Sequence, residues 1–160
     1  MKAYYFCRLD YIFVERRIIN MVNLIAHGLI IKDSQVLLIK RSRIKRGKPN
    51  FNAERWDIPG GTVELNENPR KAVAREIKEE TNCTASAIKV LYDMYQYDKN
   101  KDKEFLTLIY QTNVIDCSNI CLDPEEHSEY QWISIDDLLN SDLSLDKLEY
   151  IVPALQAMNK

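Results

Sequence analysis

Three glutamates, Glu76, Glu79 and Glu80, lie within five residues of a segment whose pattern predicts a helix. At ~100° per residue their carboxylates share an arc of about 100°. Like charges at these spacings cost roughly 0.2–0.5 kcal/mol per pair. A hard divalent cation such as Mg²⁺ reverses that penalty, because carboxylate oxygens are its ligands. Such a triplet alone is more often a solvated acidic face, so the neighbouring residues must decide.

Two features precede the acidic triplet. Trp56-Asp57-Ile58-Pro59 runs directly into Gly60-Gly61, and glycine lets a backbone approach a ligand closely. Before that lies a polar connection of about fifteen residues, 41–55, which is long for a compact domain. It carries six basic residues: Arg41, Arg43, Lys45, Arg46, Lys48 and Arg55. Two interpretations stay open, a solvated basic loop and a loop that binds an anionic substrate.

The elements that would position these residues follow from the pattern. A helix is predicted over 69–81, with Asn68 as its cap and Pro69 in its first turn. Strands are predicted at 23–31, 35–40, 88–97, 104–115 and 130–133, and further helices at 136–140 and 145–158. Strands and helices intermix without strict alternation. This predicts an α/β (mixed α+β) fold with a mixed sheet and helices on both faces.

Composition limits the function classes. The chain has 160 residues, 46% of them hydrophobic, and a net charge of −2. One globular domain is expected, and the charge argues against a protein that holds nucleic acid through bulk positive charge. No apolar run approaches the ~20 residues of a membrane span. The four cysteines show no C-x-x-C spacing, so we expect no zinc site and a reduced, cytoplasmic setting.

The first twenty residues need a separate interpretation. Arg8, Asp10, Glu15, Arg16 and Arg17 interrupt their apolar residues, so this is not a signal peptide. We expect residues 1–20 to be an appendage and residues 21–160 to form the domain. The appendage is an extra strand, a contact in a homodimer, or the product of an overlong start.

The motif itself resembles a known family. Gly61-x5-Glu67-x7-Arg75-Glu76-Ile77-x-Glu79-Glu80-x-Asn82-Cys83 is similar to the Nudix box, G-x5-E-x7-R-E-U-x-E-E-x-G-U, where U is bulky and apolar. Asn82 stands where the family has glycine, and asparagine also tolerates the left-handed conformation that ends a helix. Cys83 replaces the last bulky residue. Neither departure touches a carboxylate.

The resemblance implies a fold, an activity and a set of roles. The fold would be a Nudix-like α/β/α sandwich with a mixed central β-sheet and a loop-helix-loop box. The activity would be hydrolysis of a nucleoside diphosphate linked to another moiety, with Mg²⁺ or Mn²⁺ as cofactor. By position in the motif, Glu76, Glu79 and Glu80 match the metal-binding glutamates, Glu67 supports the site, and Arg75 orients a glutamate. Gly60 and Gly61 would approach the metal and the phosphates.

Other site residues are expected outside the box. The proton acceptor varies within the family, and among the acids before Trp132 we rank Glu126 and Glu129 first. Substrate contacts are expected from Arg41, Arg43, Arg46, Trp56, Gly61 and Tyr95. His27 and His127 are expected to be structural.

The resemblance implies a small nucleotide as substrate, and by elimination the chain resembles the MutT-like group that acts on nucleoside triphosphates. The proline typical of ADP-ribose hydrolases is missing between Pro69 and Pro124. Dinucleoside polyphosphate hydrolases typically have a tyrosine slightly beyond the position of Tyr97, so this substrate class stays open. The rival class is a nucleotide-binding sensor without activity, but such proteins usually lose box glutamates, and all four are present here.

A truncated chain that starts at Met21 tests the interpretation of the appendage. If residues 1–20 are peripheral, this variant should fold and hydrolyse the same substrate at the rate of the full chain, measured by thermal unfolding and turnover. A folded but inactive variant would instead show that the N-terminus completes the site. An insoluble variant would identify it as a structural strand.

Overall fold

The computed structural model describes residues 22–50, 52–140 and 149–158. The predicted appendage at 1–20 therefore lies outside the described residues, as does most of the segment that precedes the last helix. Within the described part of the chain, no helix is long and apolar enough to cross a membrane.

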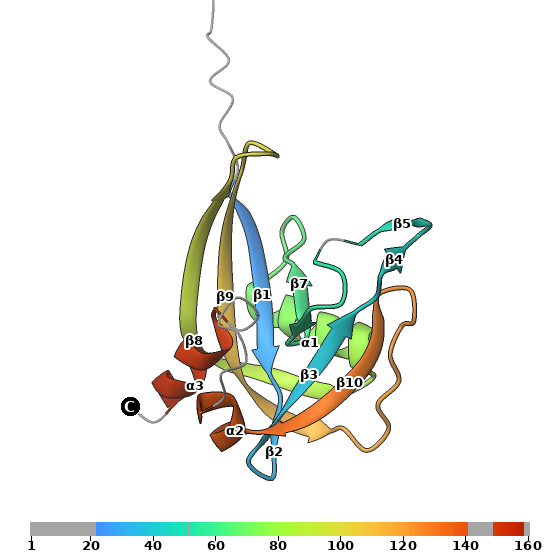
Figure 1. Ribbon diagram of the computed structural model, residues 1–160. Coiled ribbons are helices and arrows are strands. Elements are labelled where there is room, and N and C mark those ends of the chain that lie inside the picture. The colour runs from blue at the N-terminus through green and yellow to red at the C-terminus, as the bar shows by residue number, and fades with distance from the viewer. Residues whose placement is uncertain (1–21, 51, 141–148, 159–160) are drawn as a thin grey trace, which may run out of the picture.

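A mixed sheet forms the centre of the fold, in the order β7-β1-β9-β8 (Figure 1). β1 (Asn23–Leu29) pairs in parallel with β9 (Lys103–Asp116) and antiparallel with β7 (Gly60–Thr62). β8 (Thr84–Asp98) pairs antiparallel with β9 in a long hairpin. The predicted mixed sheet is confirmed. Both hairpin strands are longer than the sequence indicated.

A second, antiparallel sheet has the order β10-β3-β2, and β6 also pairs with β3. Its strands are β2 (Ile31–Lys32), β3 (Gln35–Arg41), β6 (Trp56–Asp57) and β10 (His127–Ser134). The strand predicted over 23–31 is thus broken at Ile30, and its two parts enter different sheets. The basic connection also has structure of its own, because β4 (Ile44–Lys45) and β5 (Lys48–Pro49) form a short hairpin.

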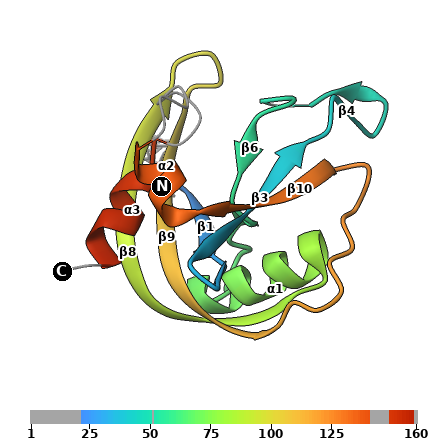
Figure 2. The ribbon, with the colours of Figure 1, turned by 60° about the horizontal axis from the view of Figure 1, so that its bottom comes forward.

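Helices cover two sides of the central sheet (Figure 2). α1 (Pro69–Thr81) packs on one side with a buried cluster that includes Ala26 and Ile77. α2 (Ile135–Asn140) and α3 (Ile151–Met158) pack on the other, against a cluster that includes Leu38 and Ile109. The last helix begins later than predicted, since Glu149 and Tyr150 lie in a turn.

The ends of α1 are fixed by local contacts. Asn68 Oδ1 accepts a hydrogen bond from the Arg70 backbone N–H at 2.9 Å, and Pro69 occupies the first turn. Asn82 ends the helix in the left-handed conformation, with φ 60°. These bounds are those that the sequence predicts, because capping depends on adjacent residues.

Cys83, directly after α1, forms a disulfide with Cys117. The expectation of reduced cysteines is therefore wrong for this pair, while Cys121 is free and exposed. The pair meets because β8 and β9 bring Thr84 opposite Asp116. The two cysteines are 34 residues apart in the sequence, so no local pattern signals that they meet.

Gly28 in β1 allows α1 to approach the sheet closely. A Cβ there would lie 2.7 Å from Ile77 Cδ1, 2.8 Å from Val73 Cγ1 and 2.9 Å from Thr112 Cγ2. Two of these atoms belong to fully buried side chains of α1, so the side chains or the helix would have to shift to admit a methyl group. The close packing of α1 on β1 therefore requires a glycine here.

We expect Gly28→Ala to lower the free energy of unfolding by roughly 1–3 kcal/mol, the usual effect of overpacking a core. Ile77→Val removes the nearest clashing methyl group, so it should recover part of that loss in the double variant. Urea unfolding of the two single variants and the double variant measures the coupling. Strict additivity of the two changes would contradict the proposed contact.

Candidate functional site

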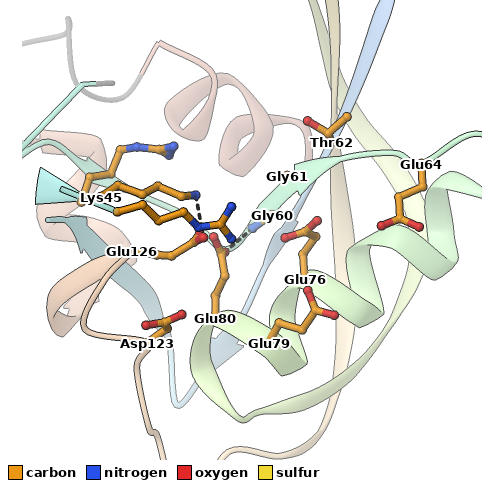
Figure 3. A pocket seen from close by; sticks show the side chains of 12 residues that line it. Lys45, Gly60, Gly61, Thr62, Glu64, Glu76, Glu79, Glu80, Asp123 and Glu126 are labelled. Atoms are coloured by element: carbon orange, nitrogen blue, oxygen red, sulfur yellow. Dashed lines mark hydrogen bonds and ion pairs between the residues drawn. The ribbon is translucent and has the colours of Figure 1, made fainter. Parts of the chain in front are cut away.

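A charged pocket of about 570 Å³ lies between α1, β7, the end of β3 with its hairpin, and the segment before β10 (Figure 3). Among the described residues, its lining includes three cations, Arg41, Lys45 and Arg46. It also includes six carboxylates: Glu64, Glu76, Glu79, Glu80, Asp123 and Glu126. Gly60, Gly61 and Thr62 complete it, so that the described lining contains no large apolar side chain.

Glu80 is the most deeply placed of the helix glutamates, with 8% of its surface exposed. Its Oε2 accepts a hydrogen bond from the Gly60 backbone N–H at 2.9 Å. Burial raises the pKa of Glu80 to about 8, and the charges of Glu76 and Asp57 act in the same direction. A buried carboxylate of this kind indicates negative charge that the protein alone does not offset.

Arg75 holds the other two helix glutamates. Its guanidinium donates to Glu76 Oε1 at 2.6 Å and to Glu79 Oε2 at 3.3 Å. Two further bonds, each 2.9 Å, go to the two oxygens of Glu67, and one of 3.2 Å goes to the Thr62 carbonyl. Arg75 holds the pKa of Glu67 down to about 2. Burial nevertheless raises the pKa of Glu76.

Neighbouring atoms lie so close to the two glycines of β7 that neither position has room for a side chain. A Cβ at Gly60 would lie 2.4 Å from the Ala26 carbonyl oxygen, and the residue has φ +152°. A Cβ at Gly61 would lie 2.8 Å from the Glu76 carboxylate. A side chain at either position would displace β1 or the acidic helix face.

The donors suit a hard divalent cation, since carboxyl groups dominate and burial raises the pKa of two of them, the buried Glu80 and the half-buried Glu76. In the part of the chain that the structure describes, no three His, Cys, Asp or Glu side chains stand close enough to hold a metal ion as they are. Glu76 and Glu79 reach towards Arg75, and Glu80 reaches Gly60. The Glu79 side chain already lines the pocket and is 60% exposed, so it can change its orientation there.

A second, mixed pocket of about 700 Å³ adjoins the first and shares Arg41, Gly60, Gly61 and Thr62 with it. Its apolar and aromatic lining is Ile25, His27, Met94, Tyr97, Phe105 and Tyr150. Its polar lining includes Asn52, Asp57, Gln96, Asp98, Lys101 and Thr107. The two pockets therefore meet at the strand β7, one charged and the other able to take a ring.

Asp57 lies where the pockets meet. Its carboxylate accepts hydrogen bonds from the Tyr150 hydroxyl and, at 2.8 Å, from the Ile58 N–H. Arg41 Nη1 lies 3.5 Å from Asp57 Oδ2. Burial and this carboxylate raise the pKa of Tyr150 well above its ordinary value. His27 Nδ1 donates to the Ile58 carbonyl at 2.9 Å, which fits the structural role expected for it.

The second histidine is buried too. His127 is 3% exposed, its Nε2 lies 3.6 Å from Glu80 Oε1, and its Nδ1 has no partner among the described residues. Burial lowers the pKa of His127 to about 4, and the nearby Arg41 acts in the same direction. The imidazole is thus neutral at ordinary pH.

The structure brings together many of the predicted site residues, and Glu67 and Arg75 support them from behind. In the charged pocket lie Arg41, Arg46, Gly60, Gly61, Glu76, Glu79, Glu80 and Glu126. Asp123 and Asp57 were not among the predicted site residues. Nor were Phe105 and Tyr150, whereas Lys45 was expected only as one of the basic residues of the connection 41–55. Tyr150 carries no signal in the sequence, because 93 positions separate it from Asp57.

Besides Glu67 and Arg75, four predicted residues lie outside both pockets. Glu129 pairs with Lys40 across β10 and β3, because a bulge after His127 changes the register there. Arg43 pairs with Glu54. Trp56 packs against the core, with Lys40 Nζ 5.7 Å from its ring centroid. Tyr95 is 58% exposed, since strand alternation turns it away from the side of Met94 and Gln96.

Comparisons with known proteins agree with this arrangement. The family model described as the NUDIX domain matches residues 22–154. The chain is 36% identical over 89 residues to an ADP-ribose pyrophosphatase of Methanocaldococcus jannaschii, covering 55% of this chain and 48% of that protein. It is 28% identical over 112 residues to an 8-oxo-dGTP diphosphatase of Buchnera aphidicola, covering 69% and 76%.

A crystal structure of a MutT protein from Methanosarcina mazei superposes with a TM-score of 0.71 at 25% identity, covering 87% of this chain and 96% of that one. The chain spans about half the length of the Methanocaldococcus jannaschii protein.

The raised pKa of Glu80 predicts a pH dependence of stability in metal-free buffer with a chelator. The folded protein holds a proton there up to a pKa of about 8, whereas an unfolded carboxyl loses it near 4.5. Stability should therefore fall as pH rises towards 8, by about 2 kcal/mol between pH 6.5 and 8. His127 opposes this fall by only about 0.4 kcal/mol, because its unfolded imidazole is half protonated at pH 6.5 while its folded imidazole is neutral throughout the window.

Glu80→Gln keeps an oxygen for the Gly60 N–H and cannot ionise, so its stability should stay nearly constant across the window. Urea unfolding at several pH values measures the difference, with Glu79→Gln at the exposed position as the matched control. A fall with pH that is equal in Glu80→Gln and in the unmodified chain would contradict the assignment.

Proposed function

The chain belongs to the NUDIX domain family, and on that premise we propose that it is a divalent-cation-dependent pyrophosphohydrolase whose substrate is a nucleoside triphosphate. The observation that carries the proposal is the pair of adjoining pockets, one lined by the helix glutamates and one lined by aromatic and apolar side chains.

The contrast between the pockets supports a substrate with one ring system. Phe105 and Met94 offer the mixed pocket surfaces on which a base can stack. The described lining of the charged pocket has no aromatic residue, so a second base would find no such surface there. This favours a mononucleotide with a chain of phosphates over a dinucleoside polyphosphate.

The charges support a polyphosphate that arrives with a cation. Among the described lining residues, six carboxylates face three basic side chains, so a free triphosphate would be repelled. The residues that would hold the cation are Glu76, Glu79 and Glu80, with Gly60 beside them. When bound, a cation of this kind neutralises phosphate oxygens and lowers the pKa of a bound water.

The remaining roles belong to the chain's own groups. Arg75 and the Gly60 N–H keep the three carboxylates from turning away. Arg41 lines both pockets and would contact the phosphate nearest the sugar. Glu126 lies across the pocket from α1 and would accept the proton of the attacking water (Figure 3).

A panel of substrates with Mg²⁺ or Mn²⁺ tests the proposal. We expect nucleoside triphosphates to be hydrolysed with the highest kcat/KM, above nucleotide sugars, dinucleoside polyphosphates and ADP-ribose. ADP-ribose belongs in the panel because of the similarity to the Methanocaldococcus jannaschii protein. A higher kcat/KM for ADP-ribose would contradict the assignment of a nucleoside triphosphate as substrate. The absence of any turnover would favour a nucleotide-binding sensor.

In the same assay, Glu79→Gln should lower kcat about 100-fold or more while the protein stays folded, because one charge that holds the cation is lost. Asp93→Asn removes a carboxylate from an exposed position on β8 outside both pockets and should leave kcat unchanged. Near-normal turnover by Glu79→Gln would refute the assignment of the acidic face.

A further inference from the structure

An ion pair crosses the charged pocket at the side opposite α1. Lys45 Nζ, from β4, lies 2.6 Å from Glu126 Oε1, from the segment before β10 (Figure 3). Both side chains line the pocket, and they are 36% and 28% exposed. The pair therefore stands where phosphates would enter, with an ammonium and the proposed proton acceptor bound to each other.

The backbones that carry this pair are joined independently of it. The Ser42 N–H donates to the Glu126 carbonyl at 2.9 Å, and the Ser42 hydroxyl donates to the Pro124 carbonyl at 2.9 Å. Breaking the ion pair would thus leave both walls in place. Only the two side chains need to move, and a lysine ammonium on its flexible stem changes partner easily.

We propose that Lys45 exchanges Glu126 for the distal phosphate of the nucleotide, and that this exchange frees Glu126 Oε1 to accept a hydrogen bond from the reacting water. The proposal rests on the proposed function and concerns the same site. A terminal phosphate offers more negative charge than one carboxylate, so it competes for the ammonium. The proton acceptor is then available only when substrate is bound.

The exchange has a thermodynamic consequence that a static phosphate contact lacks. If Lys45 must leave Glu126 before it binds phosphate, Glu126 weakens phosphate binding through Lys45. Removing the Glu126 charge should then strengthen binding, but only while Lys45 is present. Each residue's effect depends on the other, which a double-mutant cycle measures.

The hairpin supplies a matched control. Lys48 lies directly opposite Lys45 in the β4–β5 ladder, but Lys48 does not line the pocket. Asp123 supplies a second control, because it lines the same pocket from the same segment as Glu126 and has no ion pair with Lys45 within 4 Å. Asp123→Asn therefore removes an equal charge without breaking the pair.

The test measures binding of an inorganic triphosphate whose bridging oxygens are replaced by NH groups, with Mg²⁺, by calorimetry. Glu126→Gln should lower the Kd about fivefold with Lys45 present and leave it unchanged in the Lys45→Gln background. Asp123→Asn should have the same effect in both backgrounds. Lys45→Gln should raise the Kd, whereas Lys48→Gln should not.

Turnover separates the two roles. Lys45→Gln should raise KM for a nucleoside triphosphate and change kcat little, because Glu126 is already free. Glu126→Gln should lower kcat about 100-fold or more. If Lys45→Gln does not fold, Lys45→Met, which keeps the apolar stem, replaces it in every measurement.

Three results would overturn the exchange: an equal effect of Glu126→Gln in both backgrounds, equal effects of Lys45→Gln and Lys48→Gln, or no binding of the analogue by the unmodified chain. None of them depends on which nucleotide is hydrolysed. A chain that hydrolyses nucleoside triphosphates but shows no coupling would refute the exchange alone, and a chain without turnover would refute the proposed function.

Discussion

Arg75 is the cation around which the acidic face of α1 is organised. Three carboxylates on one helix arc repel one another, and in water each would turn away from the others. Here one guanidinium donates to Glu76 and Glu79 and also holds Glu67, while its bond to the Thr62 carbonyl ties the helix to β7. Planar, forked donors suit this task, which a point charge such as lysine could not perform with the same geometry. This one side chain therefore holds the helix, the turn before it and the strand β7 in the arrangement that forms the site.

Close approach of backbone is the second condition, and it makes the site costly for stability. Gly28 lets α1 press against β1, and Gly61 lets β7 pass beside the Glu76 carboxylate. Glu80 is buried, and the Gly60 N–H and the charge of Arg41 do not offset the cost of that burial, so its pKa rises. The burial of Glu80 lowers the stability of the folded state. The same burial strengthens the attraction of its carboxylate for a cation, because electrostatic attraction is stronger where water is excluded.

The strand β7 divides the binding region in two, and the C-terminal helix helps to complete the second part. Tyr150, just before α3, donates to Asp57, and Asp57 in turn lies beside Arg41. Contacts from His27 of β1, Arg41 of β3 and the residue before α3 therefore meet at one carboxylate. At this junction the charged pocket ends and the aromatic lining begins.

Local interactions explain what could be predicted from the sequence: the bounds of α1, its caps at Asn68 and Asn82, and the shared arc of the glutamates all depend on residues within a few positions of each other. The spacing of the box also indicated the fold and the contact of Arg75 with a glutamate. Tertiary structure alone decided the break at Ile30, the Cys83–Cys117 disulfide, and the burial that shifts Glu80. It also decided which basic residues reach the pocket. Lys45 and Lys48 are both lysines of the same basic connection and pair across the β4–β5 hairpin, but only Lys45 lines the pocket. Those outcomes required strands far apart in the chain to pair, and neither composition nor periodicity encodes their register.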